Sequence, residues 1–266
     1  MGPVVFVGAG PGQADLITLR GVERLRRAEV VLFDSLADPD LRAHAPQARW
    51  IDVGKRGFGG VPHAPSGTHE STGQATINAL LIKHAGEGRR VVRLKGGDPS
   101  VFGRLEEEIE ALAAAGIAVE VVPGVTAAMA AAAETARPLT RRGSGRSVSL
   151  TTAMTHDAGL VAARSADTEV FYMAGKQLAA LSRRLVEAGW PADAPASVVS
   201  RAGWPDALAS EHTVRTLGRA TVVHAGRPTV VVVGAGAAAT RTRVAATPKA
   251  NDRLAAPTTR VIALTP

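Results

Sequence analysis

Residues 4–12 read Val-Val-Phe-Val-Gly-Ala-Gly-Pro-Gly, a short apolar run that ends in a glycine-rich turn. Beyond this turn, apolar residues recur at every third position from Leu16 to Leu25, which predicts a helix with one buried face. Thr18 stands where such a helix would take its N-cap. A strand, a glycine turn and a helix in this order predict the first unit of an α/β fold.

The same alternation continues through the first half of the chain and predicts a mostly parallel sheet. Apolar runs predict strands at 30–33, 51–53, 91–94 and 119–122. Helical spacing predicts helices around 77–84 and 105–112, each followed by glycine. The stretch 57–73 is rich in Gly, Pro, Ser and His and is predicted to be a mobile loop.

A polar, basic stretch at 138–146 breaks the pattern and is predicted to link two domains. The second half predicts a mixed sheet with helices. Its expected strands are 148–151, 170–173, 197–200, 213–216 and 229–233, with a helix over 178–185. We therefore expect two α/β domains, residues 1–137 and 138–237, and a poorly ordered tail at 238–266.

Composition limits the classes of protein that fit. Of the 266 residues, 45% are hydrophobic and only 3% aromatic, so the core must consist of Val, Leu, Ile and Ala. The net charge of +7 favours a polyanionic partner, such as nucleic acid, acidic lipid or a polycarboxylate, or simply gives a soluble surface. So few aromatic residues offer little for bases to stack on, which disfavours nucleic acid.

Several other classes are disfavoured by what the sequence lacks. The chain has no cysteine, which excludes disulfides, thiolate metal sites and cysteine nucleophiles. Its 7 histidines show no ligand spacing, so no metal site is expected. No signal peptide is recognisable, and no apolar stretch approaches the roughly 20 residues of a membrane helix. We expect a cytoplasmic protein without a membrane partner.

The first glycine turn has three possible interpretations. A dinucleotide-binding motif requires a third glycine where Gln13 stands, and Pro11 removes an N–H that could hold a phosphate. Asp34, at the end of the second strand, could nevertheless be the acidic residue of that motif. The alternatives are a tight turn that needs glycine only for its backbone angles, and a nucleoside pocket without a pyrophosphate.

Two further strands end in glycine-bearing turns, Lys-Gly-Gly-Asp-Pro at 95–99 and Pro-Gly-Val-Thr at 123–126. Ligands of open α/β sheets bind beyond the carboxyl ends of the strands, where glycine lets a ligand approach the backbone. Three such turns at one edge of a sheet predict a pocket.

The segment Arg-Leu-Lys-Gly-Gly-Asp-Pro-Ser-Val-Phe-Gly-Arg at 93–104 makes the pattern specific. Together with 7–15, 54–56, 121–127 and 138–140, it resembles the uroporphyrinogen-III C-methyltransferase family of tetrapyrrole methylases. The resemblance covers most of residues 3–235. It implies a two-domain α/β homodimer with its active-site cleft between the domains. In that cleft, S-adenosylmethionine would donate methyl groups and leave as S-adenosylhomocysteine.

By this resemblance, the chain converts uroporphyrinogen III through precorrin-1 to precorrin-2. The implied cofactor contacts are Pro11, Gly96, Gly97, Asp98, Val101, Thr126, Ala127, Met173, Ala202 and Thr229. The implied catalytic residues are Asp34 and Lys55 as base and acid, and Arg104, Glu107 and Arg142 for the substrate. Guanidinium groups suit such a substrate because they bind carboxylates through two parallel hydrogen bonds.

Other interpretations of these residues and of the whole chain stay open. Asp34 could cap a turn, Lys55 could be a solvated charge, and Glu107 could serve only the dipole of its helix. Leu105 and Glu106 replace two glycines that are usual in the family, and 152–156 also departs from it. The alternatives are therefore a methylase of a later precorrin, a cofactor-binding homologue without turnover, and an NAD-dependent oxidoreductase. The pathway, whether cobalamin, sirohaem or haem d1, stays open.

Overall fold

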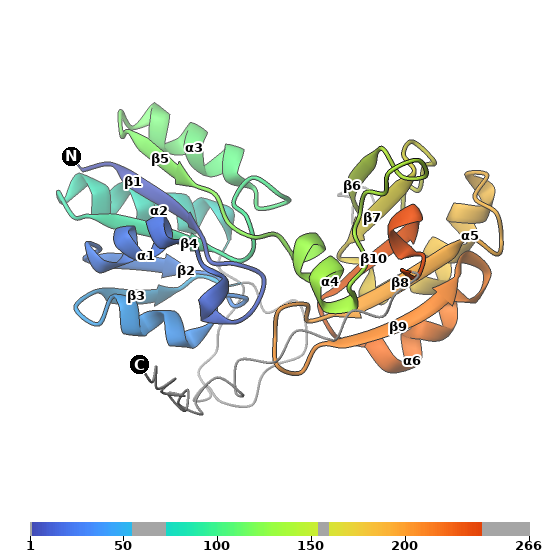
Figure 1. The fold of residues 1–266 in the computed structure, drawn as a ribbon. Coiled ribbons are helices and arrows are strands. Elements are labelled where there is room, and N and C mark those ends of the chain that lie inside the picture. Colours follow the sequence, from blue (N-terminus) through green and yellow to red (C-terminus); the bar gives the residue numbers. More distant parts are fainter. Residues whose placement is uncertain (1, 55–72, 154–159, 241–266) are drawn as a thin grey trace, which may run out of the picture.

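The computed structural model describes residues 2–54, 73–153 and 160–240, and it places two five-stranded sheets side by side (Figure 1). The predicted loop at 57–73 and the tail from 241 onward lie almost wholly outside the described residues, as does Lys55. No helix of the described residues has both the length and the apolar content needed to cross a membrane.

The first sheet is entirely parallel, with strand order β3-β2-β4-β1-β5. Its strands are β1 Val4–Gly8, β2 Val30–Phe33, β3 Arg49–Asp52, β4 Val91–Lys95 and β5 Val119–Val122. Its helices are α1 Leu19–Arg26, α2 Gln74–Gly86 and α3 Leu105–Ala114, with short 3-10 helices η1 Ala14–Leu16 and η2 Pro39–His44. Thr18 caps α1 as predicted, because its hydroxyl accepts from the Gly21 N–H at 3.1 Å.

Apolar side chains on both faces of this sheet are buried. Phe6 and Leu32 pack with Leu81 of α2 on one face, whereas Val7 and Val31 pack with helix α1 and η2 on the other. Burial on both faces explains why these strands have continuous apolar runs.

The second sheet is mixed, with order β6-β7-β10-β8-β9 and one parallel pair, β6 with β7. Its strands are β6 Val148–Thr152, β7 Thr168–Tyr172, β8 Pro195–Ser200, β9 Leu208–Thr213 and β10 Thr229–Gly234. Around it lie α4 Ala127–Thr135, α5 Leu178–Glu187, α6 Thr221–His224, η3 Ala174–Lys176, η4 Val214–Ala220 and η5 Ala235–Ala237. A parallel first sheet and a mixed second sheet confirm the predicted fold class.

One predicted strand is wrong. Of the predicted residues 213–216, only Thr213 is in a strand, as the last residue of β9, and residues 214–216 begin the 3-10 helix η4. β9 lies at the edge of its sheet and has the sequence Leu-Ala-Ser-Glu-His-Thr, without a buried apolar run. An edge strand exposed to solvent lacks the pattern that identified the central strands.

Helix α4 joins the two halves. Ala128 and Ala131 of this helix are buried with Val170 and Val230, which belong to the second sheet (Figure 1). The chain therefore reaches the second sheet soon after β5, ahead of the predicted boundary at 137/138. That boundary stays a prediction.

Candidate active site between the two sheets

The three glycine turns meet at the carboxyl end of the first sheet, as predicted. The Gly10 N–H donates to the Gly97 carbonyl at 3.2 Å, and the Gly97 N–H donates back to Gly10 at 2.7 Å. A Cβ on Gly8 would lie 2.6 Å from the Gly124 Cα and 2.8 Å from the Gly97 oxygen. The turns thus touch through main-chain atoms, and glycine is required there because a side chain has no room.

Asp98 ties the second turn to the third. Its Oδ2 accepts from the Gly124 N–H at 2.8 Å, and its Oδ1 accepts from the Ser100 N–H, also at 2.8 Å. The carboxylate therefore has a structural function besides any contact with a cofactor.

The first turn offers few N–H groups to a phosphate. The N–H groups of Ala9 and Gln13 donate to the carbonyls of Lys95 and Gly203, both at 2.8 Å, and Pro11 has no N–H. The short helix η1 also separates the turn from α1, so α1 does not begin at the glycines. Both features disfavour a dinucleotide, whose pyrophosphate is held by free N–H groups at a helix N-terminus.

The second half of the chain closes the site beside Thr126. The Thr126 hydroxyl lies 2.8 Å from the Tyr172 hydroxyl at the end of β7. The Phe102 ring lies 5.1 Å from the Tyr172 ring, with 58° between the ring planes. Burial raises the pKa of the Tyr172 phenol, so the hydroxyl stays protonated and can donate. This contact links both halves at the site.

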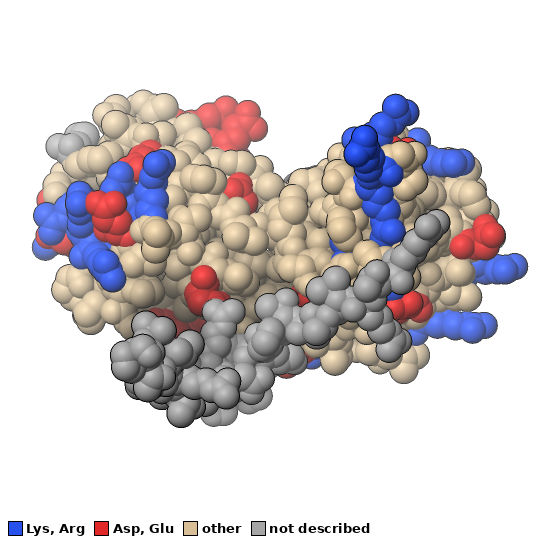
Figure 2. All heavy atoms as spheres, viewed as in Figure 1, with Lys and Arg blue, Asp and Glu red and all other residues tan. Residues whose placement is uncertain are grey.

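A second contact between the halves involves the first turn. A Cβ on Gly12 would lie 2.8 Å from the Gly203 Cα and closer still to its carbonyl carbon. Pro11 lies against the same loop, and neighbouring Ala202 is buried. Viewed from outside, the surface is hollowed between the two halves, and few charged side chains line the hollow (Figure 2).

Strained backbone gathers around this region. Phe102, Arg104, Met173 and Arg201 have φ between 51° and 57°, the left-handed region that side chains disfavour. All four follow strands, namely β4, β7 and β8. Each such residue costs on the order of 1–3 kcal/mol, and this strain typically persists at ligand sites. Met173 is among the predicted cofactor contacts, and that role stays a prediction.

An open groove of about 650 Å³ lies at the start of α3. Its lining includes Phe102, Arg104, Leu105 and three glutamates. Arg104 donates from Nε and NH2 to the two carboxylate oxygens of Glu107, at 2.7 and 2.6 Å. This hydrogen bond raises the pKa of the Arg104 guanidinium. Arg104 and Glu107, two of the three predicted substrate residues, are thus brought together on the surface.

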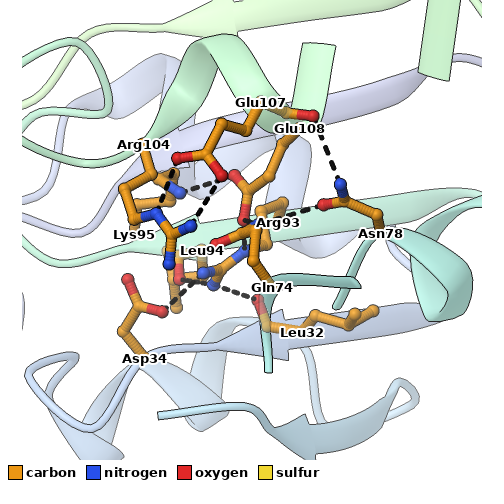
Figure 3. A network of polar contacts seen from close by, with 10 residues as sticks. All are labelled: Leu32, Asp34, Gln74, Asn78, Arg93, Leu94, Lys95, Arg104, Glu107 and Glu108. Atoms are coloured by element: carbon orange, nitrogen blue, oxygen red, sulfur yellow. Dashed lines mark hydrogen bonds and ion pairs between the residues drawn. The ribbon is translucent and has the colours of Figure 1, made fainter. Parts of the chain in front are cut away.

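A buried network lies beneath this groove (Figure 3). Arg93 donates from NH2 to Asp34 Oδ1 at 2.6 Å and from Nε to Glu108 Oε1 at 3.0 Å. Lys95 Nζ lies 2.5 Å from Glu108 Oε2. The sequence reasoning assigned no role to Arg93, Lys95 or Glu108. The available signal was two cations inside the buried strand Val-Val-Arg-Leu-Lys, which require an acidic partner.

The remaining predicted residues are less closely grouped. Val101 is half-buried beside α4, which begins at Ala127. The buried Thr229 donates its hydroxyl to the Arg227 carbonyl at 2.8 Å. Arg142 is exposed in the turn after Arg141. The roles predicted for all these residues stay predictions.

Comparison with known proteins agrees with this geometry. A model of the family of tetrapyrrole (corrin/porphyrin) methylases matches residues 3–221. A uroporphyrinogen-III C-methyltransferase of Pseudomonas aeruginosa is 44% identical over 205 residues, which are 76% of this chain and 80% of that protein. A siroheme synthase of Escherichia coli is 38% identical over 239 residues, 88% of this chain. The chain spans only 50% of that longer protein.

Solved structures give the same result. A uroporphyrin-III C-methyltransferase of Thermus thermophilus, complexed with S-adenyl homocysteine, superposes with a TM-score of 0.73 at 32% identity. The alignment covers 88% of this chain and 97% of that one. A cobalt precorrin-4 methyltransferase superposes with a TM-score of 0.74 at 29% identity, covering 89% and 96%.

Proposed function

The chain belongs to the tetrapyrrole (corrin/porphyrin) methylase family, and from this we propose that it is a uroporphyrinogen-III C-methyltransferase. It transfers two methyl groups from S-adenosylmethionine, giving precorrin-2 through precorrin-1. The observation that carries the proposal is the meeting of the turns at Gly8, Gly97 and Gly124, against Tyr172 of the other half. The uroporphyrinogen-III relative covers most of this chain, which favours this substrate over a later precorrin.

The chemistry of the turns fits S-adenosylmethionine. When bound, this cofactor supplies a methyl group already activated on a cationic sulfonium. Residues 8–12, 96–99 and 124–127 contain no cation and one carboxylate, that of Asp98. Main-chain carbonyls and one acid suit a cation, whereas a phosphate requires free donors. The residues that would hold the cofactor are Pro11, Gly96, Gly97, Asp98, Val101, Thr126, Ala127, Met173, Ala202 and Thr229.

The methyl acceptor would lie on the Phe102 side of the turns. Phe102 and Leu36 are 41% and 45% exposed, so both apolar residues are accessible to a ligand. Leu36 packs against Gly96, where a Cβ would come within 2.9 Å of the Leu36 Cβ. We expect these apolar groups to contact the macrocycle, while Arg104 and Arg142 bind its carboxylates. Glu107 would then release Arg104 or share it with the substrate.

Carbon methylation must be followed by the loss of a proton from the substrate. Asp34 is the proposed acceptor, because it ends β2 beside the second turn and its side chain is 29% exposed. Arg93 holds only its Oδ1, and no dashed line in Figure 3 reaches the other oxygen. Lys55 remains the proposed acid. A homodimer in the cytoplasm, without nucleic acid, stays part of this proposal through the family resemblance.

The test is incubation with uroporphyrinogen III and S-adenosylmethionine under anaerobic conditions, followed by mass spectrometry. We expect a product heavier by two methyl groups. Asp34→Asn should bind S-adenosylhomocysteine but form little product, whereas Asp40→Asn, an exposed change in η2, should behave as wild type. Binding of S-adenosylhomocysteine without product from uroporphyrinogen III or any later precorrin would favour a homologue without turnover.

A further inference from the structure

Four charged residues form a compact cluster between β2, β4 and α3, which we call the charged cluster: Asp34, Arg93, Lys95 and Glu108 (Figure 3). The side chains of Arg93 and Lys95 are each 3% exposed, and that of Glu108 is 1% exposed. Asp34 alone reaches the surface, at 29% exposure. Burying four charges is costly, so the cluster needs an explanation beyond packing.

Glu108 is the anchor of this cluster. Its Oε1 accepts from Arg93 Nε at 3.0 Å and from Gln74 Nε2 of α2 at 3.3 Å. Its Oε2 accepts from Lys95 Nζ at 2.5 Å. One carboxylate from α3 thus holds both cations of β4.

Arg93 connects Glu108 to Asp34 by hydrogen bonds. Its NH1 donates to the carbonyls of Leu94 at 3.0 Å and Leu32 at 3.4 Å. With Nε on Glu108, the guanidinium plane is fixed by α3 and by two strands, and its NH2 donates to Asp34. Asp34 is therefore positioned by a buried guanidinium that is itself fixed, and one of its carboxylate oxygens accepts from that group (Figure 3).

We propose that Glu108 is a positioning residue for proton removal, acting through Arg93 on Asp34, and that Lys95 balances its charge. This inference rests on the proposed function, in which Asp34 accepts the proton. Glu108 itself touches no substrate, because its side chain is only 1% exposed, and Lys95, which it holds, packs against the turn at Gly103.

The charges of the cluster sum to zero, which makes the proposal testable. The other charged groups that face it among the described residues are Arg104 and Glu107, an exposed pair on α3, and α2 contributes only the neutral Gln74 and Asn78. Removing Glu108 leaves an excess positive charge beside Asp34. Removing Lys95 leaves an excess negative charge there, so the two changes alter the local electrostatics in opposite directions.

The experiment compares Glu108→Gln and Lys95→Met with wild type in single-turnover methylation from pH 3 to 8, a range chosen to span the ionisation of a carboxylate (about 4) and of a histidine (about 6.5). For E108Q we expect a rate lowered on the order of 10- to 100-fold. We also expect the acid limb of its profile to move to lower pH by about half a unit to one unit. For K95M the acid limb should move to higher pH. The S-adenosylmethionine concentration that gives half the maximal single-turnover rate should change less than about twofold, because the glycine turns are untouched. Glu187→Gln, exposed on α5, is the control.

Opposite movement of the two acid limbs would support the proposal, since mere loosening of α3 lowers the rate equally at every pH. Profiles parallel to wild type in both variants would overturn it. Folding of E108Q is checked by circular dichroism and S-adenosylhomocysteine binding. If E108Q does not fold, the acid limb of K95M alone tests the proposal: movement to higher pH supports it, and no movement overturns it. If wild type itself forms no methylated product, the proposed function fails, and that outcome is distinct from parallel profiles of active enzymes.

Discussion

Replacing Gly8 by alanine tests whether the site is built from main-chain contacts. The new Cβ would lie 2.6 Å from the Gly124 Cα, 2.7 Å from the Gly124 nitrogen and 2.8 Å from the Gly97 oxygen. Carbon atoms prefer separations of about 3.5–4.0 Å, so the turns must separate by about 1 Å. A displacement of that size costs on the order of 100-fold where geometry matters, which corresponds to about 2.7 kcal/mol.

The assay is calorimetric titration with S-adenosylhomocysteine, paired with thermal unfolding. We expect affinity for Gly8→Ala to fall by roughly 10- to 100-fold. Overpacking should also lower the free energy of unfolding by about 1–3 kcal/mol. Gly86→Ala at the end of α2 is the matched control, because nothing lies within 4 Å of its new Cβ. If Gly8→Ala binds within twofold of wild type, the turns do not form the cofactor site.

Three further predictions concern the second half of the chain and its contact with the first. Tyr172→Phe removes the hydroxyl that faces Thr126, so the free energy of unfolding in urea should fall by about 1–2 kcal/mol; an unchanged urea midpoint would contradict this. Burial lowers the pKa of His224, so the unfolded chain takes up the proton first and stability should fall as the pH drops below about 6.5. His224→Gln should flatten this dependence in urea titrations between about pH 7 and 5, and an equal slope would refute it. Gly12→Ala places a Cβ 2.8 Å from the Gly203 Cα, so it should lower the melting temperature, whereas Gly73→Ala, with nothing within 4 Å, should not.

The strands of the parallel sheet can be predicted well from the sequence, because each is identified by a few consecutive residues. Strands β1 and β2 are apolar runs that stop at glycine or at a polar residue, and the strand bounds differ little from the prediction. The three turns could be grouped for the same reason, since parallel strands place their carboxyl ends at one edge. Edge strand β9 was misplaced because its residues are mostly polar and partly exposed.

What the sequence could not predict depends on residues far apart along the chain. Arg93 meets Asp34 from 59 positions away, and Thr126 meets Tyr172 across 46 positions. Neither pair has a characteristic spacing, so only the fold brings its members together. Glu108 stands among neighbouring glutamates, and only its 1% exposure distinguishes it from its exposed neighbour Glu106. For such residues, composition indicates that a partner is needed but not which one.

The main-chain contact of Gly8, Gly97 and Gly124 has a consequence for directed evolution. Because these three glycines touch through main-chain atoms, mutations that keep them and Asp98 leave the packing of the turns intact. Libraries that randomise the opposite wall, at Phe102 and Leu105 through Glu107, can therefore be screened for new acceptors while methyl donation is retained. In this fold, only the residues on the Phe102 side of the site should therefore be varied.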